Sequence, residues 1–176
     1  MNMYRLRSAI LYLPDRIQAK VSPTAFARRK GVKLGAGVRF YGTPNLGTEP
    51  SLITLGSNVH ITKGVEFLTH DGAVLILRKD EPNLEITKPI SIGSDVFVGV
   101  NSILLPGTRI GNRCIVAAGS VVHGSVPDNC VVAGAPARVI KTVDEYADKA
   151  RGESLCLGHL GALQKERALK DHFGIG

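Results

Sequence analysis

The chain has 176 residues, of which 44% are hydrophobic and 21% charged, with a formal net charge of +7 and three cysteines. This composition indicates one globular domain with short appendages, and no apolar run reaches the roughly 18 residues that a membrane-spanning helix needs. An odd cysteine count and the lack of a convincing signal-peptide cleavage site argue against a disulfide framework and predict a cytoplasmic protein.

Residues 1–30 form a basic segment that we expect to be helical. Residues 1–33 carry eight basic side chains and one acid, Asp15, so they account for the net charge. Ser22 and Pro23 are typical of a helix start, whereas Pro14 is expected to break an earlier helix. The apolar residues of that earlier helix follow helical spacing: Leu6, Ile10, Leu13 and Ile17.

This basic segment has two possible roles. It either caps the open end of the following domain, or it presents a basic amphipathic surface to an anionic membrane or an acidic glycan. Nucleic acid is not an expected partner, because the basic residues are not interleaved with aromatic ones in any recognisable binding motif.

Residues 31–141 carry an aliphatic repeat with a period of six, which fits neither an α-helix nor a flat strand. The repeat positions are Ile86, Ile92, Val98, Leu104, Ile110, Val116 and Val122. The residues two positions earlier are small or branched: Ile90, Val96, Ser102, Thr108, Cys114 and Ser120. Such hexads predict a parallel β-helix, in which three short sides close one coil and the coils stack through strand hydrogen bonds. Both sets of positions are expected to point inward.

The pattern continues in other phases on both sides of this block, at Leu34, Phe40, Leu46, Leu55, Ile61, Phe67, Val126 and Val132. Loops that leave the coil at its corners explain the phase shifts, and residues 71–88 form the largest candidate loop. Residues 142–176 lack the repeat and are expected to form a helical tail.

The segment from Ile92 to Lys141 resembles the end of hexapeptide-repeat acyltransferases of the galactoside, maltose and serine acetyltransferase type. The repeat, the run AGSVV, the dipeptide VP and the terminal AGAPARVIK occur in the same order. The resemblance covers about 110 residues from roughly Gly31 onward. It implies an all-β fold built as a left-handed parallel β-helix, a departure from the usual right-handed crossover. It also implies a homotrimer with active sites between neighbouring subunits.

His70 is the candidate catalytic residue. A thioester-using acyltransferase needs a base that takes a proton from the acceptor, and histidine suits this role near neutral pH. His70 follows Phe67 by three residues and opens the large loop in the string FLTHDG. The catalytic histidine of sugar O-acetyltransferases stands at the corresponding place, and THDG looks most like the capsule and surface-polysaccharide O-acetyltransferase branch.

Two further residues are candidates for the acceptor site. Asp71 either orients His70, as carboxylates do in hydrolytic triads, or forms the turn before Gly72. Asn45 stands near the place where sugar-specific relatives carry an asparagine that contacts the acceptor.

The resemblance implies acetyl-CoA as the acyl donor and no metal. The residues expected to contact it are Val100, Ala118, Gly119, His123, Arg138 and Lys141. The first three would leave backbone groups accessible to the pantetheine arm, and His123 stands where relatives often carry a cofactor-contacting threonine. Arg138 and Lys141 match the two basic positions near the phosphates.

We therefore expect an acetyl-CoA-dependent O-acetyltransferase that acts on a sugar, nucleotide sugar or surface-polysaccharide precursor by direct transfer. The alternatives are N-acylation of an amino sugar or another small molecule, and a noncatalytic trimeric platform. A carbonic anhydrase built on the same coil would need converging imidazoles, and His60, expected at the surface, shows no such pattern with the other histidines. Cys114 and Cys130 are predicted to be buried, which argues against a thiol nucleophile.

Overall fold

The computed structural model describes residue 15 and residues 17–175. The chain divides into two compact units, Met1–Val143 and Asp144–Gly176, and each is described by itself. The expectations for Leu6, Ile10, Leu13 and Pro14 fall outside the described residues.

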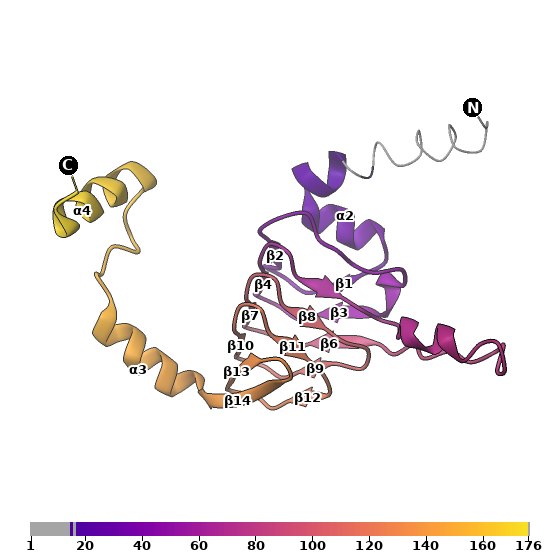
Figure 1. Cartoon of the computed structure of the whole chain (residues 1–176). Helices are drawn as coiled ribbons and strands as arrows, with labels where there is room; N and C mark the ends of the chain where they lie inside the picture. The colour runs from indigo at the N-terminus through magenta and orange to yellow at the C-terminus, as the bar shows by residue number, and fades with distance from the viewer. Residues whose placement is uncertain (1–14, 16, 176) are drawn as a thin grey trace. The chain divides into compact units, whose positions relative to one another are not determined.

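In the first unit, helical residues 17–21 precede helix α2 (Pro23–Arg29), which lies over the first turn of the coil (Figure 1). Pro23 occupies the first helical turn after Ser22, as the sequence predicts. Ala27 is fully buried and belongs to the same core as the coil, so α2 covers its first turn. Contact of this segment with a membrane or glycan stays a prediction.

The coil consists of short strands in three sheets. The first sheet contains β1 (Lys33–Leu34), β3 (Ile53–Leu55), β6 (Ile90–Ile92), β9 (Arg109–Ile110) and β12 (Ser125–Val126). The second contains β2 (Arg39–Phe40), β4 (Val59–Ile61), β7 (Val96–Val98), β10 (Cys114–Val116), β13 (Cys130–Gly134) and β14 (Ala137–Thr142). The third contains β5 (Glu66–Phe67), β8 (Ile103–Leu104) and β11 (Val121–Val122).

The chain visits these three sheets in turn, and each strand pairs in parallel with the strand one turn later. This order gives the predicted stack of parallel coils (Figure 1). Strand β13 belongs to the last turn and pairs in parallel with β10, and β14 follows as its antiparallel partner. Two short 3₁₀ helices, η1 (Pro50–Leu52) and η2 (Gly72–Ile76), interrupt the coil.

The predicted inward positions form the core. From Ile92 to Val122 every repeat position is at most 4% exposed. Ile86 is the exception, because it lies in the loop before β6 and is 37% exposed; its assignment to the repeat was wrong. The residues two positions before the others are also buried, including Ser102, Thr108 and Ser120. Their hydroxyl groups donate to backbone carbonyls, which satisfies them in the dry interior.

The cysteines fit the sequence prediction only in part. Cys114 is buried, and this burial raises the pKa of its thiol. Cys130 is only half-buried, because β13 belongs to the last turn and no further coil covers it. Both thiols are free.

The second unit contains helix α4 (Ala162–Phe173) and all but the first residue of helix α3 (Val143–Glu153). Neither helix has a buried residue. Among the described residues, no helix combines the length and apolar character needed to span a bilayer.

Candidate functional site

His70 lies where the chain leaves the third sheet and enters the loop of residues 71–88. The base of this loop is closed by backbone hydrogen bonds: Asp71 N–H donates to Ile86 O at 2.9 Å, and Lys88 N–H donates to Thr69 O at 2.8 Å. His70 also forms an antiparallel bridge with Thr87. The loop projects away from the coil (Figure 1), while its base holds the His70 backbone in a fixed place.

The imidazole of His70 is held by two side chains from the previous turn of the coil. Nδ1 lies 3.1 Å from Glu49 Oε2 and 3.0 Å from Thr48 Oγ1. The Thr48 hydroxyl donates to Glu49 Oε1 at 2.6 Å, so its oxygen is left to accept from the histidine. The Thr69 hydroxyl donates to Glu49 Oε2 at 2.6 Å.

These hydrogen bonds fix the charge of the carboxylate. The hydroxyls of Thr48 and Thr69, followed by His70, hold the pKa of Glu49 at about 2, although partial burial opposes this shift. Glu49 is therefore ionised near neutral pH and favours the tautomer that carries hydrogen on Nδ1. Nε2 then has a free lone pair, and it has no hydrogen-bond partner among the described residues. The His70 side chain is 38% exposed, so a substrate can reach it.

Glu49 reaches His70 because the chain between residues 43 and 49 passes close to the next turn. Gly47 has a φ of +64°, and a Cβ there would lie 2.7 Å from Phe67 O. Only glycine tolerates both the positive φ and this close approach. Asn45 belongs to the same segment and forms a parallel bridge with Glu66 of β5. The Asn45 Nδ2 also donates to the Glu66 carboxylate. The structure therefore places Asn45 one turn above the strand that leads to His70.

Asp71 does not contact the His70 ring. Its Oδ1 accepts a hydrogen bond of 2.9 Å from Ala73 N–H and caps the 3₁₀ helix η2. Of the two roles that the sequence allowed for Asp71, the structure shows the turn-forming one. The carboxylate beside the imidazole comes from Glu49.

The candidate cofactor residues lie on three parts of the coil. Val100, Ala118 and Gly119 are exposed at the corner between the second and third sheets, where Gly119 N–H donates to Val100 O at 2.8 Å. His123 is exposed at the corner between the third and first sheets, which also carries His70 in an earlier turn. Arg138 and Lys141 lie on β14.

His60 lies outside this site. It points outward from β4, where Nδ1 lies 2.8 Å from the Tyr41 hydroxyl and Nε2 lies 3.1 Å from Asn58 Oδ1. In the part of the chain that the structure describes, no three histidine, cysteine or acidic side chains converge as a metal site would require.

A cavity of about 800 Å³ lies between the N-terminal helical residues and the segment of residues 43–50. Apolar side chains such as Phe26 and Leu46 line it together with Lys20 and Lys30. Thr48 belongs to both this cavity and the hydrogen-bonded group around His70. Through Thr48, the wall of the cavity is therefore joined to the side chains that hold the His70 ring.

Comparison with known proteins identifies the family. A family model described as the hexapeptide repeat of succinyl-transferase matches residues 89–123. Protein CapG of Staphylococcus aureus is 48% identical over 124 residues, which are 69% of this chain and 72% of CapG. The chain belongs to the hexapeptide-repeat acyltransferases.

Other members share a smaller part. A 2,3,4,5-tetrahydropyridine-2,6-dicarboxylate N-acetyltransferase of Staphylococcus aureus strain MRSA252 is 41% identical over 95 residues, which span 54% of this chain and 35% of that enzyme. A serine acetyltransferase structure from Brucella abortus strain S19 matches with a TM-score of 0.50 and 29% identity over 64% of this chain and 40% of its own. The soybean serine acetyltransferase complexed with serine has a TM-score of 0.50 and 26% identity, with 62% and 40% covered.

For a hexapeptide-repeat acyltransferase, the arrangement around His70 can perform general-base chemistry. The carboxylate of Glu49 orients the ring through Nδ1, and the unpartnered Nε2 can accept a proton from an acceptor group. Sequence reasoning did not find Glu49 or Thr48. The repeat changes phase after Leu46, so the register that would have placed Glu49 beside His70 was lost at that point.

Proposed function

We propose that this chain is an acetyl-CoA-dependent O-acetyltransferase whose acceptor is a sugar, a nucleotide sugar or a surface-polysaccharide precursor. The observation that carries the proposal is the pairing of His70 Nδ1 with Glu49, which leaves Nε2 free at the base of a projecting loop. The acetyltransferases among the matched proteins support an acetyl group as the transferred unit.

The reaction is a direct transfer. The acceptor hydroxyl gives its proton to Nε2 of His70 while its oxygen attacks the thioester carbonyl, and Glu49 stabilises the imidazolium that forms. The tetrahedral intermediate then collapses, the carbon–sulfur bond breaks, and the proton on Nε2 passes to the departing thiolate. No acyl-enzyme is needed, and the buried Cys114, whose thiol pKa is raised, is poorly suited to form one.

The donor would be held by residues on separate parts of the coil. Val100, Ala118 and Gly119 offer backbone groups to the pantetheine arm, and Arg138 and Lys141 offer charge to the phosphates. A homotrimer of left-handed coils, with sites between neighbouring subunits in the cytoplasm, would bring such groups to the histidine of another subunit. His123 shares its corner with His70 and would contact the same cofactor.

A second candidate is transfer to an amine. The matched tetrahydropyridine-dicarboxylate enzyme is named an N-acetyltransferase, and a histidine base serves an amine as well as a hydroxyl. The substrate chemistry therefore has to be tested directly.

The test is an acceptor panel with acetyl-CoA and thiol detection. Hydroxyl sugars, nucleotide sugars and their amino-sugar counterparts are compared at equal concentration, with product mass measured. Thiol release that depends on a sugar hydroxyl, and an alkali-labile ester in the product, support O-acetylation. Transfer to amines alone would replace it with the second candidate.

A further inference from the structure

The outward face of the first sheet has an unusual composition. Strand pairing aligns one outward residue from each of its strands, one per turn of the coil: Lys33, Thr54, Ser91, Arg109 and Ser125. This row holds two cations and three hydroxyl groups, with no acid and no apolar residue. We call it the first-sheet row.

The second sheet shows that such a row is not a general property of the coil. Its aligned positions are Arg39, His60, Phe97, Ile115 and Val131, and the last of these is buried. Below His60 these positions are aromatic or aliphatic, and Phe97 is 43% exposed. The polar, cationic character therefore belongs to the first sheet, whose middle strand β6 follows the loop after His70.

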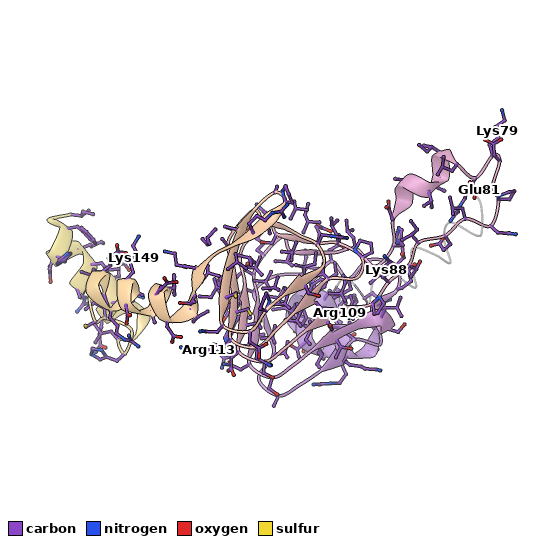
Figure 2. The ribbon with its side chains drawn as sticks, turned by 90° about the horizontal axis from the view of Figure 1, so that it is seen from below. Lys79, Glu81, Lys88, Arg109, Arg113 and Lys149 are labelled. Atoms are coloured by element: carbon purple, nitrogen blue, oxygen red, sulfur yellow. The ribbon has the colours of Figure 1, made fainter. Side chains whose placement is uncertain are left out.

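Lys88 extends the first-sheet row to the catalytic corner. Its backbone N–H bonds to the carbonyl of Thr69, the residue before His70. Its side chain lies along Gly107, whose hypothetical Cβ would be 3.1 Å from Lys88 Cδ. Gly107 precedes Arg109 by two residues, so Lys88 and Arg109 occupy the same part of the surface. Figure 2 shows Lys88 at the base of the projecting loop and Arg109 on the neighbouring part of the coil, with Arg113 farther from the loop.

The cations of this surface are available to a ligand. Within residues 17–175, no ion pair engages Lys33, Lys88 or Arg109. The acids nearest to the row in sequence, Asp95 and Asp128, lie at the far corner of the first sheet. Their carboxylates already accept hydrogen bonds from Asn58 and Asn112.

Strands in a sheet are about 4.8 Å apart, so five aligned positions span roughly 19 Å. In this row, Lys33 and Arg109 are three positions apart, and the hydroxyl groups of Thr54 and Ser91 lie between them. An extended anionic chain along the row would therefore meet a cation, two hydroxyl groups and a second cation. Cations bind carboxylates and phosphates through charge-assisted hydrogen bonds, and serine and threonine can pair with sugar hydroxyls. No aromatic side chain in the row is available to stack on nucleic-acid bases.

We propose that the first-sheet row and Lys88 bind an acidic glycan and lead it toward His70, so that the acceptor bears carboxylate or phosphate groups. This inference rests on the proposed function, since it names the acceptor class of the same site.

Binding without turnover tests the inference. A galacturonic acid tetramer supplies carboxylates, UDP-N-acetylglucosamine supplies phosphates, and maltotetraose is the neutral control, each titrated by calorimetry at low and physiological salt. At least one acidic probe should bind, and maltotetraose should not. Arg109→Ser and Lys88→Met should each weaken the acidic probe roughly tenfold, the usual size of one lost charged hydrogen bond. Methionine keeps the packing on Gly107.

Arg39→Ser is the matched control, because it removes a cation from the outward position of β2 in the second sheet. It should leave the affinity for the acidic probe unchanged. If Arg39→Ser weakens binding as much as Arg109→Ser does, the loss reflects net charge alone and the proposal is overturned. Absence of binding by both acidic probes, or equal binding of a short DNA duplex, would also overturn it.

Acetyl-CoA affinity, measured in the same variants, separates the acceptor from the donor site. It should be unchanged in Arg109→Ser and Lys88→Met, and a parallel loss would assign the surface to the donor instead. Thiol release is recorded independently. If no acceptor supports transfer while the acidic probe still binds through Arg109, the proposed function fails and the glycan-binding surface stands.

Discussion

Two turns of the coil pass from the third sheet to the first in different ways. After β8 the chain turns tightly, and the buried Thr108 hydroxyl donates to the carbonyls of Leu105 and Val122. After β5 the chain leaves in a long loop, and the buried Thr69 hydroxyl donates to the Glu49 carboxylate. Thr108 thus stabilises the backbone of the coil, whereas Thr69 holds the charged side chain of Glu49 against His70. We call the corner after β5 the functional corner, because it holds the candidate base. Its buried donor serves a charged side chain, whereas the donor after β8 serves the coil itself.

Removing the histidine should have the largest effect on this functional corner. His70→Ala is expected to lower turnover by roughly 10²–10⁴-fold, because the acceptor proton loses its base, while acetyl-CoA affinity is retained. Steady-state kinetics and calorimetric titration of acetyl-CoA measure the two quantities. His60→Ala, which removes a histidine that points away from the site, is the control and should be nearly silent. Near-normal turnover in His70→Ala would remove this residue from the mechanism.

Glu49→Gln should give the next largest loss, on the order of 10²-fold in turnover, because the amide no longer favours the reactive tautomer or stabilises the imidazolium. Asp71→Asn is the comparison, since Asp71 caps η2 and does not touch the ring. If Asp71→Asn proves as damaging as Glu49→Gln, the carboxylate beside His70 is not the one that orients it during catalysis.

The proposed phosphate contacts predict a smaller, ligand-specific effect. Arg138→Ala and Lys141→Ala should each weaken coenzyme A roughly tenfold, and its analogue without the 3′-phosphate much less, because each variant removes one charged contact. Competition binding with both ligands distinguishes them. Equal weakening would place both residues away from that phosphate.

The two buried threonines allow the comparison itself to be tested. Thr108→Val should lower the free energy of unfolding by about 1 kcal/mol through its lost hydrogen bonds, with little change in activity. Thr69→Val should reduce turnover at the same time, because Glu49 loses a donor. Urea unfolding and kinetics on both variants give the two effects. A Thr69 variant with lower stability and unchanged turnover would make the two corners equivalent.

The sequence predicted the coil well because inward positions recur in strict register. Val98, Leu104 and Val116 are fully buried as expected, since each turn repeats the same environment. Ile86 failed because spacing alone cannot distinguish a turn of the coil from a loop of the same length. His70 was predicted from its place before the loop and from the family resemblance, and its catalytic role stays a prediction. Glu49 was not, because 21 residues separate it from His70 and the repeat changes phase between them.

The smallest effect concerns acid. The folded-state pKa of Glu49, about 2, lies below its ordinary value of 4.5, so the ionised carboxylate stabilises the fold. This contribution is complete above the ordinary value and is lost as pH falls through the folded-state pKa. The difference in unfolding free energy between the wild-type chain and Glu49→Gln should therefore be constant above about pH 5 and shrink toward pH 2. Because Glu49 is 37% exposed, solvent screening keeps the difference small. Urea unfolding across this range measures it, and a difference independent of pH would mean that the carboxylate is not held ionised by its neighbours.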